Sequence, residues 1–147
     1  MSNVRSFLRL TPAERAFFLR ALMVVGVVRL GLTVLPFRKV HRVVCRRSER
    51  ALHRARSLPG NASLTTERIV WIVQAASARV PHATCLTRAL AAQWLLAERG
   101  HPSEVSIGVA RAESEAFAAH AWLTCEGAEL GTAERDRYTP IATIAVR

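Results

Sequence analysis

The hydrophobic pattern first predicts a long apolar helix over residues 13–35. Thr11 and Pro12 suit its start, because a capping hydroxyl and a proline at the first helical position both fit that end, and Pro36 stops it. A membrane-spanning helix needs about 20 apolar residues, whereas Arg29 divides this one into two charge-free stretches of eight residues. We therefore expect a helix that is buried in the core or faces a partner, with membrane contact as the alternative.

A second, strongly basic helix is predicted over residues 38–57. Its basic side chains are Arg38, Lys39, Arg42, Arg46, Arg47, Arg50, Arg54 and Arg56, and its apolar side is Val40, Val43, Val44 and Leu52. The simplest interpretation of the charge is a solvated face. The alternatives are a surface for an acidic peptide, an anionic membrane or nucleic acid. Nucleic acid is the weakest of these, because the segment contains no aromatic residue that could stack on bases.

After a Leu-Pro-Gly-Asn break at residues 58–61, the pattern changes from helical towards alternating. The elements expected there are helices over 66–79 and 85–99 and strands over 104–110, 117–125, 128–132 and 141–146. Glu126 and Gly127 supply the turn between the second and third strands. We therefore predict an α+β protein with two parts, a basic and apolar helical region over residues 1–57 and a helix-and-sheet core over residues 58–147.

Composition narrows the possible functions. The net charge of +10 belongs to residues 1–57, which hold 13 basic residues against 2 acidic ones, while residues 58–147 hold 8 against 9. The three cysteines lie 40 residues apart, which is a poor disulfide framework. We therefore expect reduced thiols and a cytoplasmic protein, with membrane association as the alternative. The sequence has no glycine-rich phosphate loop, so nucleotide binding is not indicated.

The clearest chemical signal is a cysteine at a predicted helix start. Cys85 follows the loop Pro81-His-Ala-Thr84 and opens the helix over residues 85–99. At such a position the backbone N–H groups and the helix dipole stabilise a thiolate, and the same N–H groups can form an oxyanion hole. A cysteine of this kind taken alone is nevertheless more often a core residue than a nucleophile.

A histidine inside a predicted strand supplies the second signal. Alternation places His120, Trp122 and Thr124 on one face of the strand. A lone histidine here is more often a core residue whose ring bonds a backbone carbonyl. A thiolate–imidazole pair needs its members within hydrogen-bond reach, and a helix packed on the adjoining sheet can supply that. The combination favours Cys85 as a nucleophile and His120 as its base, with Trp122 as a wall of the substrate cleft.

A zinc site is the competing chemistry for the same residues. His82, Cys85, His120 and Cys125 could supply four ligands. Paired zinc ligands normally come from two tight knuckles, whereas these come from a helix start and a strand. We therefore predict no metal and no cofactor, and we treat Cys45 and Cys125 as spectators.

These motifs resemble the transglutaminase-like peptidases of lasso-peptide biosynthesis over about residues 60–145. The matching elements are Cys85-Leu-Thr-Arg-Ala-Leu90, an apolar helix ending in Arg99-Gly100, Ser106-Ile-Gly-Val109 and His120-Ala-Trp122, in order and at compatible spacing. The resemblance implies a transglutaminase- or papain-like core in a cysteine peptidase that removes the leader from a ribosomally made precursor. It implies that Cys85 attacks the carbonyl one residue beyond a leader threonine, while His120 takes the thiol proton and returns it to the leaving amine.

The chain departs from the family pattern at the third catalytic member. The family places an acidic residue about twelve residues after the histidine, and that position holds Thr132. A three-residue loop would bring Thr132 opposite His120, whereas a two-residue turn would bring Ala133. A slight bulge would bring Glu134 to the ring, and Glu129 is the next candidate. We take Glu134 as the expected third member.

The resemblance also implies partners. Residues 1–57 do not read as the strand-rich leader-recognition domain that some members carry fused, so we expect a separate leader-recognition protein to present the precursor. An ATP-dependent cyclase, which joins the new amine to an acidic side chain, is a further expected partner, and nucleic acid is not. Two other functions stay open: a noncatalytic or acyl-transferring member of the same fold, and a basic membrane- or nucleic-acid-associated binding protein.

Overall fold

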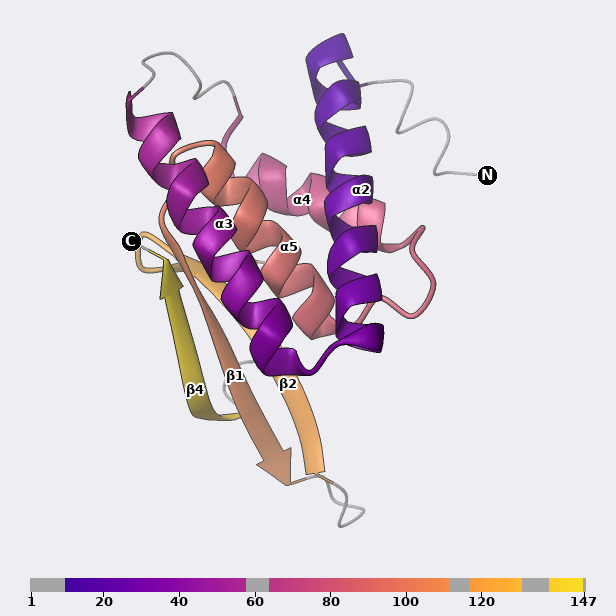
Figure 1. The fold of residues 1–147 in the computed structure, drawn as a ribbon, viewed down its shortest axis with the longest axis vertical. Helices are drawn as coiled ribbons and strands as arrows, with labels where there is room; N and C mark the ends of the chain where they lie inside the picture. The colour runs from indigo at the N-terminus through magenta and orange to yellow at the C-terminus, as the bar shows by residue number, and fades with distance from the viewer. Residues whose placement is uncertain (1–9, 58–63, 112–116, 131–137, 147) are drawn as a thin grey trace.

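The computed structural model describes residues 10–57, 64–111, 117–130 and 138–146 of the chain. Its helices and strands, in chain order, are α2 (Pro12–Val34), α3 (Phe37–Ser57), α4 (Thr66–Ser77), α5 (Cys85–Glu98), β1 (Ser103–Arg111), β2 (Phe117–Cys125), β3 (Ala128–Leu130) and β4 (Thr139–Val146). The predicted α+β class is confirmed: within the described ranges the helices come first and the strands form one antiparallel sheet (Figure 1). The two-part division of the chain stays a prediction, since the proposed boundary lies outside the described residues.

Helix α2 begins at the predicted threonine–proline pair. The Thr11 hydroxyl accepts a hydrogen bond from the Glu14 N–H at 3.2 Å, and the Glu14 carboxylate accepts one from the Thr11 N–H at 2.8 Å. This reciprocal capping box satisfies two backbone donors that the helix leaves open at its start. The helix ends before Pro36, where the Leu35 N–H still donates to the Gly31 carbonyl at 2.8 Å.

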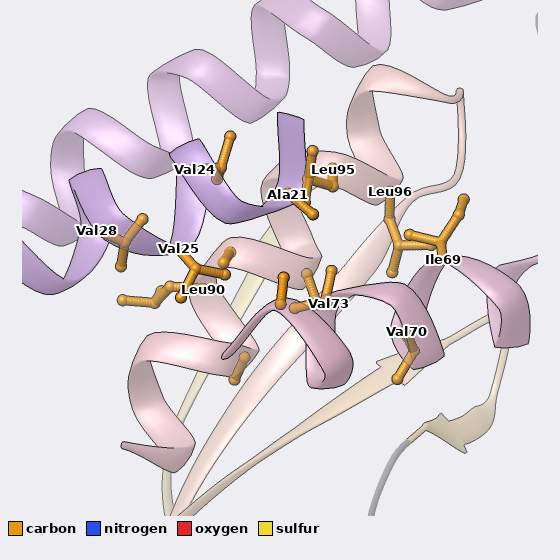
Figure 2. Close-up of a cluster of buried hydrophobic side chains, with 14 of the residues drawn as sticks. Ala21, Val24, Val25, Val28, Ile69, Val70, Val73, Leu90, Leu95 and Leu96 are labelled. Carbon is orange, nitrogen blue, oxygen red and sulfur yellow. The ribbon is translucent and has the colours of Figure 1, made fainter. Parts of the chain in front are cut away.

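The core is built around α5, which lies between α2 and α3 and packs on β1 and β2. Figure 2 shows the tightly packed centre, to which α2, α4 and α5 all contribute. The residues labelled there are Ala21, Val24, Val25 and Val28 of α2, Ile69, Val70 and Val73 of α4, and Leu90, Leu95 and Leu96 of α5. Two ion pairs also hold α2 in place, Arg20 with Glu98 on α5 and Glu14 with Arg68 on α4.

Helix α2 buries one face only. By length and composition it is the one helix of the described chain that could cross a membrane, with a mean hydropathy of 1.9 over its most apolar window and 33% of that window buried. Core helices and signal sequences share these properties, so composition alone does not place the helix in a membrane. The expected burial is confirmed for the face towards α4 and α5, and the opposite face is exposed.

Helix α3 packs on α5 through residues four apart, namely Val40, Val44, Ser48 and Leu52. This spacing keeps one face of a helix towards its neighbour. Val43, which the sequence places on the apolar side, is 52% exposed instead. The reason is the helical period. Successive residues of an α-helix are rotated by about 100°, so Val43 points away from the buried line that contains Val44.

The sheet has the order β3-β2-β1-β4, so the first strand is central and pairs with the last. Val105, Ala121 and Leu123 belong to the helical core, so this face of the sheet packs against the helices. The predicted turn at Glu126 and Gly127 is confirmed, and both residues have a positive φ, 51° and 81°. A two-residue turn with this geometry is typical of a tight hairpin, which sets the pairing between β2 and β3.

Candidate functional site

Cys85 is the first residue of α5, as the sequence predicts. The N-cap is Thr84, whose hydroxyl accepts a hydrogen bond from the Thr87 N–H at 3.3 Å and lies 3.1 Å from the Thr87 hydroxyl. A turn precedes the cap, in which His82 adopts a φ of 58°. The thiol therefore projects from the first turn, where backbone N–H groups point outwards, and it is half-exposed.

His120 lies on β2, opposite Gly108 of β1. Its ring is half-exposed and stacks with two aromatic rings, with centroids 6.5 Å from Trp122 and 5.1 Å from Tyr138. His120 and Trp122 thus lie on the same face of β2, as predicted, and their rings are in contact. The stacking limits how far the imidazole can turn.

Gly108 explains how the Trp122 ring fits beside the histidine. A Cβ at this position would lie 2.8 Å from two carbons of the Trp122 ring and 3.0 Å from the Thr139 carbonyl oxygen. The indole therefore occupies the space that any larger residue on β1 would need, and it is buried, with 4% exposure. The Ile-Gly-Val sequence of β1 is thus matched to the His-Ala-Trp sequence of β2 by direct contact.

Cys85 and His120 line the same small pocket, which has a volume of about 50 Å³ and opens to solvent. Its walls are Val70, Val73 and Gln74 of α4, Cys85, Arg88, Ala89 and Ala92 of α5, His120, Ala121, Trp122 and Leu123 of β2, and Leu130 of β3. Apolar side chains form most of the lining, and a few polar groups converge on it. This is the usual composition of a small ligand or peptide subsite.

The catalytic pair itself stays a prediction. Among the described residues no hydrogen bond joins the Cys85 thiol to the His120 ring, although both line one pocket. The expected third member, Glu134, lies outside the described residues, as do the alternatives Thr132 and Ala133. The remaining candidate, Glu129, is exposed and pairs with Thr124, four residues along β2 from the histidine.

Three pocket or ring neighbours were not predicted from the sequence as site residues. Arg88 lies one turn after Cys85 on α5, and Gln74 reaches the same pocket from α4. A spacing of three residues on one helix face was the signal that could have found Arg88. Tyr138, which stacks on His120, follows a long stretch without periodicity, so no sequence signal pointed to it.

The other two cysteines are in different environments. The Cys45 thiol on α3 lies 3.1 Å from His41 Nε2, and the Cys125 thiol donates a hydrogen bond to the Pro102 carbonyl at 3.2 Å. Burial raises the pKa of both the Cys45 and the Cys125 thiol. A thiol with a raised pKa is a weak nucleophile at neutral pH, so these two cysteines suit structural positions.

The residues that the structure describes contain no cluster of three or more histidine, cysteine or acidic side chains that could hold a metal ion. In particular, the four residues considered for zinc do not come together among them. The prediction of no cofactor stays a prediction.

Comparison with known proteins assigns the family. A family profile described as the transglutaminase-like superfamily matches residues 22–143. No curated protein and no solved structure matches the chain. The matched segment covers most of the chain, from the middle of α2 to β4, so the protein belongs to the transglutaminase-like superfamily. The expected transglutaminase-like core is thereby confirmed, and this superfamily includes cysteine peptidases and acyltransferases.

Proposed function

We propose that this member of the transglutaminase-like superfamily is a cysteine peptidase that removes the leader from a ribosomally synthesised lasso-peptide precursor. The observation that carries the proposal is the shared pocket: Cys85 at the start of α5 and His120 on β2 line one opening in the protein surface. The resemblance of the surrounding motifs to lasso-peptide leader peptidases supplies the substrate class.

The chemistry follows from the two groups. The Cys85 thiol gives its proton to the His120 ring, and the sulfur attacks the carbonyl carbon of the scissile peptide bond. The N–H groups at the start of α5 stabilise the oxyanion that forms. The carbon–nitrogen bond then breaks, and the imidazolium returns its proton to the leaving amine. Water, deprotonated by His120, hydrolyses the remaining thioester and frees the leader carboxylate.

The imidazole needs a neighbour that fixes its orientation. Trp122 and Tyr138 already restrict the ring by stacking. We propose Glu134, the third catalytic member expected from the sequence, as the acidic partner of the His120 ring. The wall formed by Trp122 is proposed to hold the substrate chain against Cys85, which its place in the pocket lining supports.

Arg88 is proposed to bind the substrate main chain. It is exposed, lies one turn after Cys85 and lines the pocket. A guanidinium presents several N–H donors, so it can bond the carbonyl oxygens of an extended peptide placed across the thiol.

The partners and location follow from the same proposal. A separate leader-recognition protein presents the precursor, and an ATP-dependent cyclase uses the amine that cleavage exposes. The peptidase and the cyclase both act on a peptide made by the ribosome, which supports a cytoplasmic location. The basic, apolar segment formed by α2 and α3 supports association of this cytoplasmic protein with a membrane surface.

Cleavage of the precursor tests the proposal. The full chain is incubated with the precursor and the leader-recognition protein, and the fragments are identified by mass spectrometry. Cys85→Ala and His120→Ala are expected to lower the cleavage rate by at least about 10³-fold. Cys45→Ala removes a thiol on α3 and is expected to cleave at the rate of the unsubstituted protein.

Two results would contradict the proposal. Full cleavage by Cys85→Ala would show that Cys85 is not the nucleophile. Transfer of the leader acyl group to an added amine, with no free leader carboxylate, would show an acyltransferase instead of a peptidase.

A further inference from the structure

The exposed apolar side chains of this protein gather on its N-terminal helices. Among the described residues, eight of the ten large hydrophobic side chains that are exposed lie between residues 19 and 43. They are Leu19, Met23, Val27, Leu30, Val34, Leu35, Phe37 and Val43. Single exposed hydrophobic residues are normal on a protein surface, whereas a concentration of this kind marks an interaction surface.

The first five of these residues form one line along α2, which we call the α2 stripe: Leu19, Met23, Val27, Leu30 and Val34. Their spacing of three or four residues keeps them on one side of the helix. Their exposed fractions are 60%, 52%, 55%, 65% and 70%. The α2 stripe is therefore a continuous aliphatic surface that no described part of the chain covers.

Positive charge adjoins one end of the α2 stripe. Helices α2 and α3 meet at a junction and diverge from it (Figure 1). Gly31 and Val40 lie close together there, since a Cβ on the glycine would be 3.4 Å from Val40 Cγ2. Arg38, Lys39 and Arg42 begin α3 next to this contact, and all three are exposed. Residues 1–57 as a whole carry 13 basic residues against 2 acidic ones.

A surface that is aliphatic along one line and cationic beside it complements an apolar layer beneath a layer of negative charge. We propose that the α2 stripe and the first turns of α3 bind the surface of an anionic lipid bilayer. The aliphatic side chains enter the boundary between headgroups and acyl chains, and Arg38, Lys39 and Arg42 contact the lipid phosphates. This site is separate from the peptidase pocket and does not depend on the proposed function.

The fold places α2 on the bilayer rather than across it. The opposite face of α2 contributes Val24, Val25 and Val28 to the core, and the ion pairs of Arg20 and Glu14 hold the helix on α5 and α4. A spanning helix would have to leave these contacts. A helix that keeps one face in the protein and offers an apolar line on the other suits the plane of the interface.

An acidic protein is the alternative partner for the same surface. Protein interfaces concentrate their binding energy in tryptophan, tyrosine and arginine side chains that fill pockets on the partner. The α2 stripe contains only leucine, methionine and valine, and the exposed aromatic residue beside it is the single Phe37 at the start of α3. A long aliphatic line with one aromatic residue at its end favours the lipid bilayer, since interfacial helices combine aliphatic residues with phenylalanine in this way.

Vesicle flotation with the full chain tests the inference. Vesicles of phosphatidylcholine and vesicles with equal parts of phosphatidylcholine and phosphatidylglycerol are compared. The protein is expected to float with the anionic vesicles and to bind the neutral ones at least about tenfold more weakly. About 1 M sodium chloride, which shortens the screening length to about 3 Å, is expected to release most of the bound protein.

Matched variants locate the contact. Met23→Gln/Val27→Gln/Leu30→Gln changes exposed side chains only and is expected to weaken anionic-vesicle binding by at least about tenfold, with an unchanged circular dichroism melting curve. Arg38→Gln/Lys39→Gln/Arg42→Gln is expected to do the same. Arg50→Gln/Arg54→Gln/Arg56→Gln removes the same charge from the distant end of α3 and is expected to have a smaller effect.

Four outcomes would overturn the inference. The first is a protein that does not float with anionic vesicles, and the second is an equal loss of binding in the two triple variants of basic residues. The third is retention of the protein on vesicles after an alkaline carbonate wash. The fourth is slower cleavage without lipid by the α2-stripe variant, in a chain that binds no vesicles. The third outcome would show a spanning helix, and the fourth would show a protein partner for the α2 stripe. Binding by the unsubstituted chain is measured first, so the test stands even if a variant does not fold.

Discussion

Helices α2 and α5 are both rich in apolar residues, but the fold uses them differently. Helix α5 buries nine of its 14 residues, because α2, α3 and α4 contact it on one side and the sheet on the other. Helix α2 buries six of its 23 residues, and no described part of the chain covers the α2 stripe. Hydrophobic composition therefore does not tell how much of a helix is buried; the number of elements that surround it does.

The sharpest way to test this difference is to remove one leucine from each helix. Leu90 of α5 is fully buried, whereas Leu30 of α2 is 65% exposed. Leu90→Ala is expected to lower the free energy of unfolding by about 2–5 kcal/mol, because it leaves a cavity in the core. Leu30→Ala is expected to change it by less than about 0.5 kcal/mol. Urea denaturation of both variants measures the two values, and similar losses would contradict the comparison.

Two glycines make the second comparison. Gly108→Ala is expected to lower the free energy of unfolding by about 1–3 kcal/mol, because the new methyl group meets the Trp122 ring. At Gly26 of α2, no described atom other than those of the adjoining helix backbone and chain neighbours lies within 4 Å of the corresponding position. Gly26→Ala is therefore expected to stabilise the protein by up to about 1 kcal/mol through helix propensity.

Gly108→Ala carries a second readout, because Trp122 stacks on His120. Displacing the indole is expected to lower the rate of precursor cleavage as well as the stability. Gly26→Ala is expected to leave the cleavage rate unchanged. A Gly108→Ala protein with the stability and the activity of the unsubstituted chain would contradict the contact between β1 and the histidine face.

The smallest expected effect concerns the start of α2. The hydrogen bond from Arg68, with the N–H of Thr11 adding to it, holds the pKa of Glu14 below its usual range. A lowered pKa in the folded state means that the charged carboxylate stabilises the fold above the unfolded-state pKa, and that this contribution disappears as the pH falls through the folded-state value.

Glu14→Gln is therefore expected to lower the melting temperature slightly at neutral pH and to have no effect at strongly acidic pH. Glu49→Gln on α3, an exposed glutamate, serves as the control. A difference between Glu14→Gln and the unsubstituted protein that persists below both pKa values would contradict the ion pair as its cause. The expected change is small, because an ion pair near the protein surface, here with the Arg68 side chain 38% exposed, contributes little.

Much of the fold could be predicted because its signals are local. The capping box at Thr11, the glycine that follows α5 and the two-residue turn at Glu126 each fix a boundary with residues a few positions apart. Local signals could not predict that the α2 stripe is exposed, since its exposure depends on which other helices cover it. The same limit explains Val43, which stays exposed because none of the described elements covers its side of α3.

The candidate site also contains residues that local sequence pattern predicts and residues that it does not. Cys85 at its helix start and His120 in its strand are set by local pattern, and the structure brings both to one pocket. Gln74 and Tyr138 come from elements far apart in the chain, so only the tertiary arrangement could place them there. The fit between Gly108 and Trp122 is likewise a contact across two strands, and neither residue alone predicts it.

The most direct test of the account is the reactivity of the three cysteines towards iodoacetamide, followed peptide by peptide by mass spectrometry at neutral pH. Cys85 is expected to be alkylated faster than Cys45 and Cys125, whose thiol pKa values are raised by burial. His120→Ala is expected to slow the alkylation of Cys85 by at least about tenfold and to leave the other two rates unchanged. Equal rates for Cys85 in the two proteins would show that the imidazole does not activate the thiol.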